Sequence, residues 1–241
     1  MYIWIQLGVQ GFVGLMLLIA LWPTDKTAAK VLRKWHVADP TPAQVAESKV
    51  YLKRRRLLYP WLFLAIGYGA SKLLPAADYF VPQILLTVLA GMLLAELISA
   101  ARPTRGPRRV AVLAPRRVVD VVPAWGLVVF GAAAVALAVA LVVARPVPVP
   151  SLIALAAVVL AVTGAVRLAV RRPTSGDEAV DAALRVRSGR VALGLGLAMT
   201  GMLVGGSSPG GFALLALCVV LIGLGWNLVT PPVRAEAPVR G

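Results

Sequence analysis

Long uncharged apolar stretches alternate with short blocks of basic residues along the 241-residue chain, and this alternation limits the folds open to it. Charged residues make up 15% of the chain, against about 25% in an ordinary soluble domain. A helix needs roughly 20 apolar residues to cross a bilayer. The sequence therefore predicts an all-α, polytopic membrane helix bundle that forms a single integral membrane domain over residues 1–241. About seven transmembrane helices are expected, at residues 3–22, 57–74, 80–100, 124–144, 151–170, 191–205 and 211–229.

A turn sequence, and not a charged loop, separates the last two predicted spans. No charged residue lies between Val191 and Thr230, a stretch much longer than one span. Its middle, residues 205–211, reads GGSSPGG. A helix interior would lose about 1 kcal/mol for each glycine and about 3 kcal/mol for the proline. The stretch is therefore interpreted as a hairpin of two spans.

Basic residues indicate the orientation, because cytoplasmic loops retain Lys and Arg. The segments that follow the first, third and fifth predicted spans hold most of the 25 Lys and Arg residues. The loops on the opposite side hold only Lys72 and Arg145. This asymmetry predicts a multi-pass protein of the cell membrane with its N-terminus outside and its C-terminus inside.

Residues 23–56 are expected to form a cytoplasmic loop with a juxtamembrane helix, and to be too few to build a core of their own. Thr41, Pro42 and Gln44 fit the N-cap, N1 and N3 positions of a capping box, so the helix should begin near Thr41. A short helix is also expected over residues 179–187, with Asp177 and Glu178 at its start.

The residue types that membrane enzymes need are scarce in this sequence. His36, the only histidine, lies in the first predicted cytoplasmic loop, which excludes an HExxH metalloprotease and argues against histidine-based zinc or haem sites. No glycine run is followed by Lys-Ser or Lys-Thr, as a phosphate-binding loop requires. Asp177, Glu178 and Asp181 form an acidic cluster that is interpreted as a solvated helix start in preference to a metal site. We expect no catalytic residues, no metal site and no cofactor.

Two charged residues fall inside predicted spans at similar depths. Glu96 and Arg167 lie about four and three residues from the cytoplasmic boundary, or roughly 5 to 6 Å at 1.5 Å per residue. An unpaired charge at that depth is costly. An intramembrane ion pair between Glu96 and Arg167 is the favoured interpretation. Separate snorkelling of the two side chains and a proton or substrate relay are the alternatives.

Small residues recur at helical spacing on two predicted spans, which lets another helix backbone approach closely. Packing within the bundle is the favoured interpretation, and a homodimer seam is the alternative. The helix-packing residues are Ala132, Ala136 and Ala140 in the fourth span, and Gly194, Ala198, Gly201 and Gly205 in the sixth.

The basic blocks fix the topology and are also candidates for contact with anionic lipid headgroups, worth about 1 kcal/mol per residue near the surface. Nucleic acid is not an expected partner, because retention of Lys and Arg in cytoplasmic loops accounts for the net charge of +15. The candidate lipid contacts are Lys53, Arg54, Arg55, Arg56, Arg108, Arg109, Arg116 and Arg117.

Two blocks, YLKRRR at residues 51–56 and APRRVVD at 114–120, occur beside Ala/Val/Gly-rich spans in a chain that favours Arg over Lys after residue 72. In these features the sequence resembles uncharacterised multi-pass membrane proteins of actinobacteria. The resemblance implies a membrane location and carries no activity.

These features together favour a non-enzymatic accessory or scaffold protein. It would bind a protein partner, or a second copy of itself, through helix faces and cytoplasmic loops. A small-solute or ion transporter or channel is the alternative. A transporter is expected to have polar or broken helices that converge near the middle of the membrane, whereas the fourth and fifth predicted spans are nearly featureless.

Overall fold

The computed structural model describes residues 2–73, 80–101, 117–144, 146–171, 177–206 and 212–230, and within these ranges the chain forms helices and no strands. The helices are α1 (Tyr2–Ala20), α2 (Asp25–Lys34), α3 (Pro42–Arg56), α4 (Tyr59–Leu73), α5 (Phe80–Ala101), α6 (Val118–Val121), α7 (Ala124–Val143), α8 (Val149–Arg171), α9 (Glu178–Gly206) and α10 (Phe212–Val229).

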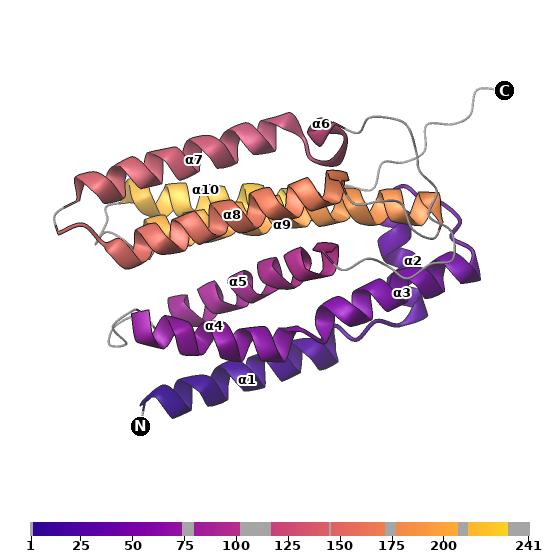
Figure 1. Cartoon of the computed structure of the whole chain (residues 1–241), viewed down its shortest axis with the longest axis horizontal. Helices are drawn as coiled ribbons and strands as arrows, with labels where there is room; N and C mark the ends of the chain where they lie inside the picture. Colours follow the sequence, from indigo (N-terminus) through magenta and orange to yellow (C-terminus); the bar gives the residue numbers. More distant parts are fainter. Residues whose placement is uncertain are drawn as a thin grey trace.

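The bundle is organised around α9, which contacts α5, α7, α8 and α10, and also α2, α3 and α6. On one side α1 packs on α4 and α4 on α5, while α7, α8 and α10 lie on the other side (Figure 1). The main hydrophobic core sits where α5, α7, α8, α9 and α10 meet. Its members include Leu93, Phe130, Val162, Leu197 and Leu221.

Three helical segments are long and apolar enough to cross a membrane: Gln83–Ala101, Ala124–Val143 and Val149–Arg171. A fourth is possible if Trp4–Ala20 and Asp25–Lys34, which meet at 85°, are counted as one broken span. The outward faces of the helices are apolar, and Val128, Val135, Leu160 and Val219 are 63–73% exposed. Soluble monomers rarely expose apolar surface on this scale, so the fold fits a helical membrane protein.

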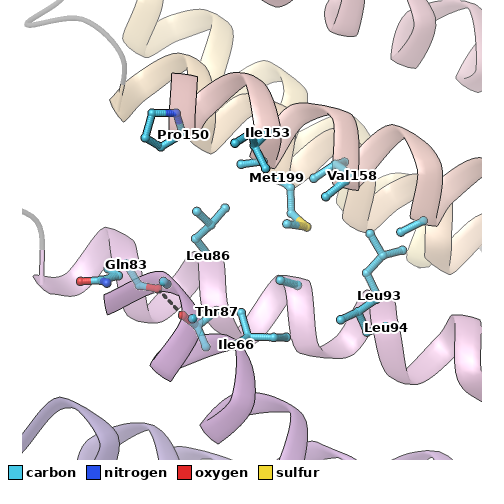
Figure 2. Close-up of a pocket in the computed structure, with 16 residues that line it drawn as sticks. Ile66, Gln83, Leu86, Thr87, Leu93, Leu94, Pro150, Ile153, Val158 and Met199 are labelled. Atoms are coloured by element: carbon cyan, nitrogen blue, oxygen red, sulfur yellow. Dashed lines mark hydrogen bonds between the residues drawn. The ribbon is translucent and has the colours of Figure 1, made fainter. Parts of the chain in front are cut away.

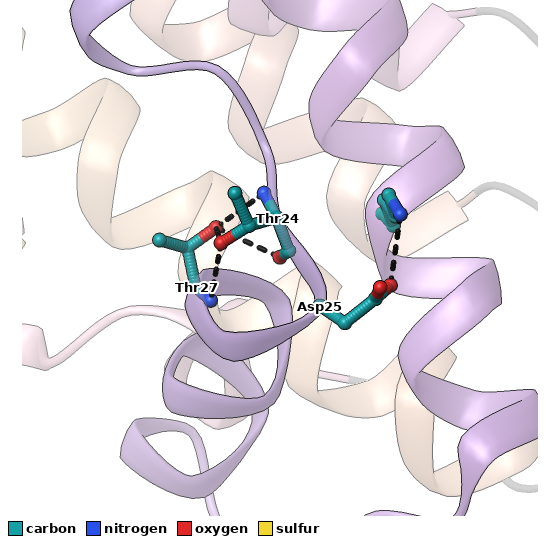
Figure 3. Close-up of polar contacts among 4 residues, drawn as sticks. Thr24, Asp25 and Thr27 are labelled. Atoms are coloured by element: carbon teal, nitrogen blue, oxygen red, sulfur yellow. Dashed lines mark hydrogen bonds and ion pairs between the residues drawn. The ribbon is translucent and has the colours of Figure 1, made fainter.

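Two helices, and not a loop with one helix, occupy residues 25–56. A capping box starts α2: the amide of Thr27 donates to the hydroxyl of Thr24 over 3.3 Å, and the amide of Thr24 donates to the hydroxyl of Thr27 over 2.9 Å (Figure 3). Asp25 then forms a 2.9 Å ion pair with Lys49 of α3. The capping box predicted at Thr41 is present and α3 begins after it.

The α2–α3 hairpin packs against the first turns of α9 through a second small core. Leu32 and Trp35 from the first half of the hairpin, and Leu52 from the second, meet Val180 and Leu184 of α9. Residues 23–56 share this core with α9, which supplies one face of it. The hairpin is therefore part of the bundle and not a free loop.

A single helix of 29 residues, α9, replaces the separate short helix and short span that were expected over residues 179–187 and 191–205. At 1.5 Å per residue it is about 44 Å long, which exceeds the roughly 30 Å of a hydrocarbon core. Gly189 does not break it. A Cβ atom at Gly189 would lie 2.5 Å from Val121 and 2.9 Å from Val122, so this glycine allows α6 to lie against the uninterrupted helix.

Candidate functional site

Glu96 is the most deeply buried charged group of the helices described here, with a side chain that is 0% exposed. It lies on α5 and meets residues of both α3 and α9. Arg55 Nε is 2.7 Å from Glu96 Oε2, and the Tyr51 hydroxyl donates to Oε1 over 2.5 Å. Arg187 Nη1 lies 3.6 Å from Oε2. These four residues, Glu96, Arg55, Tyr51 and Arg187, are called the Glu96 cluster.

The amphipathic pattern of α3 brings two members of the cluster together. Its buried residues are Ser48, Tyr51, Leu52 and Arg55, at the i, i+3, i+4 and i+7 spacing of one helix face. Tyr51 and Arg55 therefore point in the same direction, toward α5. The guanidinium of Arg55 also lies 5.8 Å from the centre of the Tyr59 ring, which adds a favourable cation–π contact.

The electrostatics of the Glu96 cluster hold three helices in one arrangement. Burial raises the pKa of Tyr51, and the negative charge of Glu96 raises it further, so the phenol stays protonated and donates. Two guanidiniums share one carboxylate oxygen. Removing one partner of a buried ion pair leaves an uncompensated charge, which costs about 3–5 kcal/mol. The cluster therefore ties α3 and α9 to α5.

A second set of polar contacts joins the start of α3 to the start of α9. Asp177 caps α9, because its Oδ1 accepts from the amides of Ala179 and Val180 over 3.0 and 3.1 Å. Its Oδ2 accepts from the Gln44 side chain over 3.0 Å, and its own amide donates to Glu47 over 3.2 Å. The contact with Gln44, followed by the amide of Val180, lowers the pKa of Asp177. The cap is therefore strongest when this carboxylate is charged.

Near its N-terminus α9 also binds the end of α8. Arg185 Nη1 donates to the carbonyl of Ala169 over 3.1 Å, and Arg185 Nε lies 2.5 Å from Asp181 Oδ2 one turn earlier. Both charged side chains are buried. A cation at a helix C-terminus satisfies a carbonyl that has no helical partner. The first four turns of α9 therefore hold α3, α5 and α8 by charge.

The predicted ion pair between Glu96 and Arg167 is wrong. Glu96 pairs with Arg55 and Arg187, whereas Arg167 is exposed on α8. The reason is the rotation of α8: the stripe that faces the core runs through Val162, Ala165, Val166 and Ala169, and Arg167 lies off that stripe. Similar depth is therefore not enough to make two charges meet.

The basic block of α3 divides into buried and exposed members. Lys53 and Arg54 are exposed, and the Lys53 ammonium lies 5.4 Å from the centre of the Trp22 ring. Arg55 is buried against Glu96 and is not free to contact lipid, contrary to expectation. Arg56 is half-buried and Arg117, next to α6, is exposed. The remaining candidates, Arg108, Arg109 and Arg116, lie outside the described residues.

The two predicted small-residue stripes have different surroundings. A Cβ at Gly194 would lie 2.5 Å from the carbonyl oxygen of Gly225, and one at Gly201 would lie 3.0 Å from that of Cys218. The α9 stripe thus lies along α10 from Gly194 through Ala198 to Gly201. The surroundings of Gly205, the last predicted member, lie outside what the structure describes. Among the helices that the structure describes, the stripe of α7 lies on the exposed side, away from the core formed by the other side of α7. Its exposed members are Ala132, Ala136 and Ala140.

A cavity of about 330 Å³ lies between α4, α5, α8 and α9 (Figure 2). Leu86 of α5 faces Ile153 of α8 and Met199 of α9 across it. Of its 16 lining residues, Gln83 and Thr87 are polar and none is charged. The Thr87 hydroxyl donates to the Gln83 carbonyl over 2.9 Å, so it is already satisfied by its own helix. The cavity suits an apolar occupant.

Sequence reasoning missed Arg55, Tyr51 and Arg187 as the partners of Glu96. A usable signal existed for the first two, because they continue the helical face that Ser48 and Leu52 begin. An arginine on the apolar face of a juxtamembrane helix requires a buried carboxylate, and Glu96 is the one that the spans offer. No local sequence pattern identifies Arg187 as a partner of Glu96. This contact depends on α9 being one continuous helix through residue 189.

Comparison with protein-family models, curated proteins and solved structures finds no match to this chain. Among the described residues, no three His, Cys, Asp or Glu side chains are placed to hold a metal ion.

Proposed function

We propose that the chain is a non-enzymatic accessory or scaffold subunit of the bacterial cell membrane. The Glu96 cluster carries this proposal, because it ties the α2–α3 hairpin to α5 and α9 and so holds the hairpin in a fixed position at one end of the bundle. A fixed, charged surface suits the docking of a protein partner or a second copy of the chain. The exposed cations of that surface are Lys26, Lys30, Arg33, Lys53 and Arg54.

The proposal includes seven spans, with the N-terminus outside and the C-terminus inside. The spans would be α1, α4, α5, α7, α8, the part of α9 from Val191 onward, and α10. The hairpin and the start of α9 lie at the same end of the bundle (Figure 1). This shared end is rich in Lys and Arg, as expected of a cytoplasmic face.

The alternative function, transport of an ion or a small solute, would use the cavity between α5 and α8. Its lining offers no charged group to compensate an ion, and a charge in an apolar medium is expensive unless it is paired. The buried charges of the Glu96 cluster lie among helix contacts and not in this lining. Both observations favour a structural role.

Cysteine accessibility tests the topology. In a Cys218→Ala background, Ala144→Cys and Arg54→Cys place single thiols at exposed positions at the two ends of the bundle. An impermeant thiol reagent applied to intact cells should label the first and not the second, which should react only after permeabilisation. The opposite pattern would reverse the orientation, and equal labelling of both would contradict a membrane-spanning arrangement.

Reconstitution tests the functional class. The purified chain in liposomes should give no ion or solute flux above that of empty vesicles. It should copurify from its native membrane, in mild detergent, with a constant stoichiometric partner or as a homo-oligomer. The recovery of that partner should fall in a Lys30→Glu, Arg33→Glu variant and persist in a Glu178→Gln control, which changes an exposed charge of α9 and none of the hairpin cations. Flux through the reconstituted protein would establish the transporter alternative instead.

A further inference from the structure

The cavity between α4, α5, α8 and α9 opens at the side of the bundle. Its wall on α8 includes Ile153 and Ala157, which are exposed, and its wall on α5 includes Leu93, which is buried in the core. The cavity therefore extends from the surface of the bundle to its interior. Both α5 and α8 are long and apolar enough to cross a membrane. In a membrane, lipid hydrocarbon and not water surrounds this opening.

The length of the cavity matches the depth of one leaflet of a bilayer. Its lining runs from Gln83 to Leu94 on α5 and from Pro150 to Ala161 on α8. At 1.5 Å per residue each stretch covers about 16 Å, and half of a hydrocarbon core is about 15 Å thick. Figure 2 shows Gln83 and Pro150 at one end of the cavity and Leu94 at the other. The cavity thus begins near the ends of two spans and stops near their middle.

One polar atom among the lining residues lacks a partner. The side-chain amide nitrogen of Gln83, Nε2, is buried and has no hydrogen-bond partner among the described residues. A buried donor without an acceptor is costly. Gln83 lies in the first turn of α5, at the start of a candidate span. The ester carbonyls of phospholipids accept hydrogen bonds, and they lie at this depth, where the hydrocarbon core meets the headgroups.

We propose that the cavity is a binding site for one acyl chain of a membrane phospholipid. The ester carbonyl of that chain accepts a hydrogen bond from Gln83 Nε2. The hydrocarbon runs between α5 and α8 toward Met199 of α9 and supplies the dispersion contacts that an empty cavity lacks. Binding requires that α5 and α8 cross the membrane, and it does not depend on whether the chain acts as a scaffold.

Native mass spectrometry of the purified full chain in dodecyl maltoside tests the carbonyl contact. Phosphatidylglycerol with ester-linked oleoyl chains and its ether-linked analogue, which lacks the carbonyls, are titrated separately. The wild type should bind the ester lipid saturably and the ether lipid about two- to tenfold more weakly, as expected for one hydrogen bond. Gln83→Leu should bind both lipids equally. No saturable binding of the ester lipid, equal binding of both lipids to the wild type, or an unchanged ester preference in Gln83→Leu would overturn the proposal.

Two neighbouring exposed alanines of α8 locate the acyl chain. Ala157→Phe adds a ring at the wall of the cavity and should weaken binding of the ester lipid about tenfold or more. Ala156→Phe makes the same change outside the lining and should leave binding nearly unchanged. An equal loss in both variants would overturn the site.

A quinone with a long apolar chain is the competing occupant. Phylloquinone is titrated in the same way, and it should bind more weakly than the ester lipid. Tighter binding of phylloquinone, lost in Ala157→Phe, would overturn the phospholipid as the occupant. If Ala157→Phe fails to fold, the comparison of ester and ether lipids on the wild type and on Gln83→Leu still decides the proposal.

Discussion

The two halves of α9 are held by opposite means. Its first turns bind α5 and α8 through buried charges, at Arg187 and Arg185. Its later turns pack closely on α10, because Gly194 and Gly225 have no side chains to keep the two backbones apart. Ion pairs are directional and fix which helix faces which, whereas a glycine seam fixes only how closely two helices approach. The chain thus uses charge at the end where the polar helices α2 and α3 join the apolar helices.

The largest expected effect comes from breaking the charged half. Glu96→Gln keeps the size of the side chain but leaves Arg55 and Arg187 buried without a counter-charge, which should lower the free energy of unfolding by about 3–5 kcal/mol. Unfolding in mixed detergent and denaturant measures this. Glu178→Gln is the control, because Glu178 is exposed at the start of the same α9. A loss of stability no greater than that of the control would contradict a structural role for the cluster.

A smaller loss is expected from the glycine seam. Gly194→Ala places a Cβ atom 2.5 Å from the carbonyl oxygen of Gly225, so α9 and α10 must separate. Overpacking of this kind costs about 1–3 kcal/mol. Gly223→Ala is the matched control, since a Cβ atom there meets nothing within 4 Å. If the two variants melt at the same temperature, the helices do not make this close approach.

The sequence predicts features that depend on neighbouring residues, but not the long-range contacts of the charged half of α9. Apolar stretches and the capping box at Thr41 depend on residues within a few positions of each other, and the structure has helices at these places, although α9 joins two segments that were expected to be separate. Glu96 and Tyr51 are 45 residues apart, and their contact depends on how α3 and α5 are rotated about their axes. Hydropathy gives the depth of a charge in the membrane but not that rotation. For the same reason Arg167 was matched to Glu96 by depth alone.

At two places the local sequence pattern does not by itself predict the helix that forms. Thr24 and Thr27 form a capping box that predicts α2, but its N3 residue is threonine and not the Glu or Gln of the usual pattern. Gly189 and its charged neighbours suggest a break in α9, yet α9 continues through this glycine and α6 lies against it. The first signal is local but uses an unusual residue, whereas the second depends on a tertiary contact.

A modest, pH-dependent effect is expected at the cap of α9. Asp177→Ala should cost about 0.5–2 kcal/mol, because the amides of Ala179 and Val180 lose their acceptor. The folded pKa of Asp177 is below its ordinary value of 3.8, so its stabilisation is complete above that value and disappears as the pH falls through the folded pKa. The difference in melting temperature between wild type and variant should therefore shrink only in strong acid. A difference that stays constant down to that range would contradict the charged cap.

The most direct test of the account is a pair of double-mutant cycles on Glu96. In the first, Glu96→Gln is combined with Arg55→Gln, and the double variant should lose clearly less stability than the sum of the single variants, with a coupling of about 1–3 kcal/mol. In the second, Glu96→Gln is combined with Arg167→Gln, and the losses should add to within about 0.5 kcal/mol. This result would show that the Glu96 cluster holds the α2–α3 hairpin against the rest of the bundle. Additive losses with Arg55, or coupling with Arg167, would contradict it.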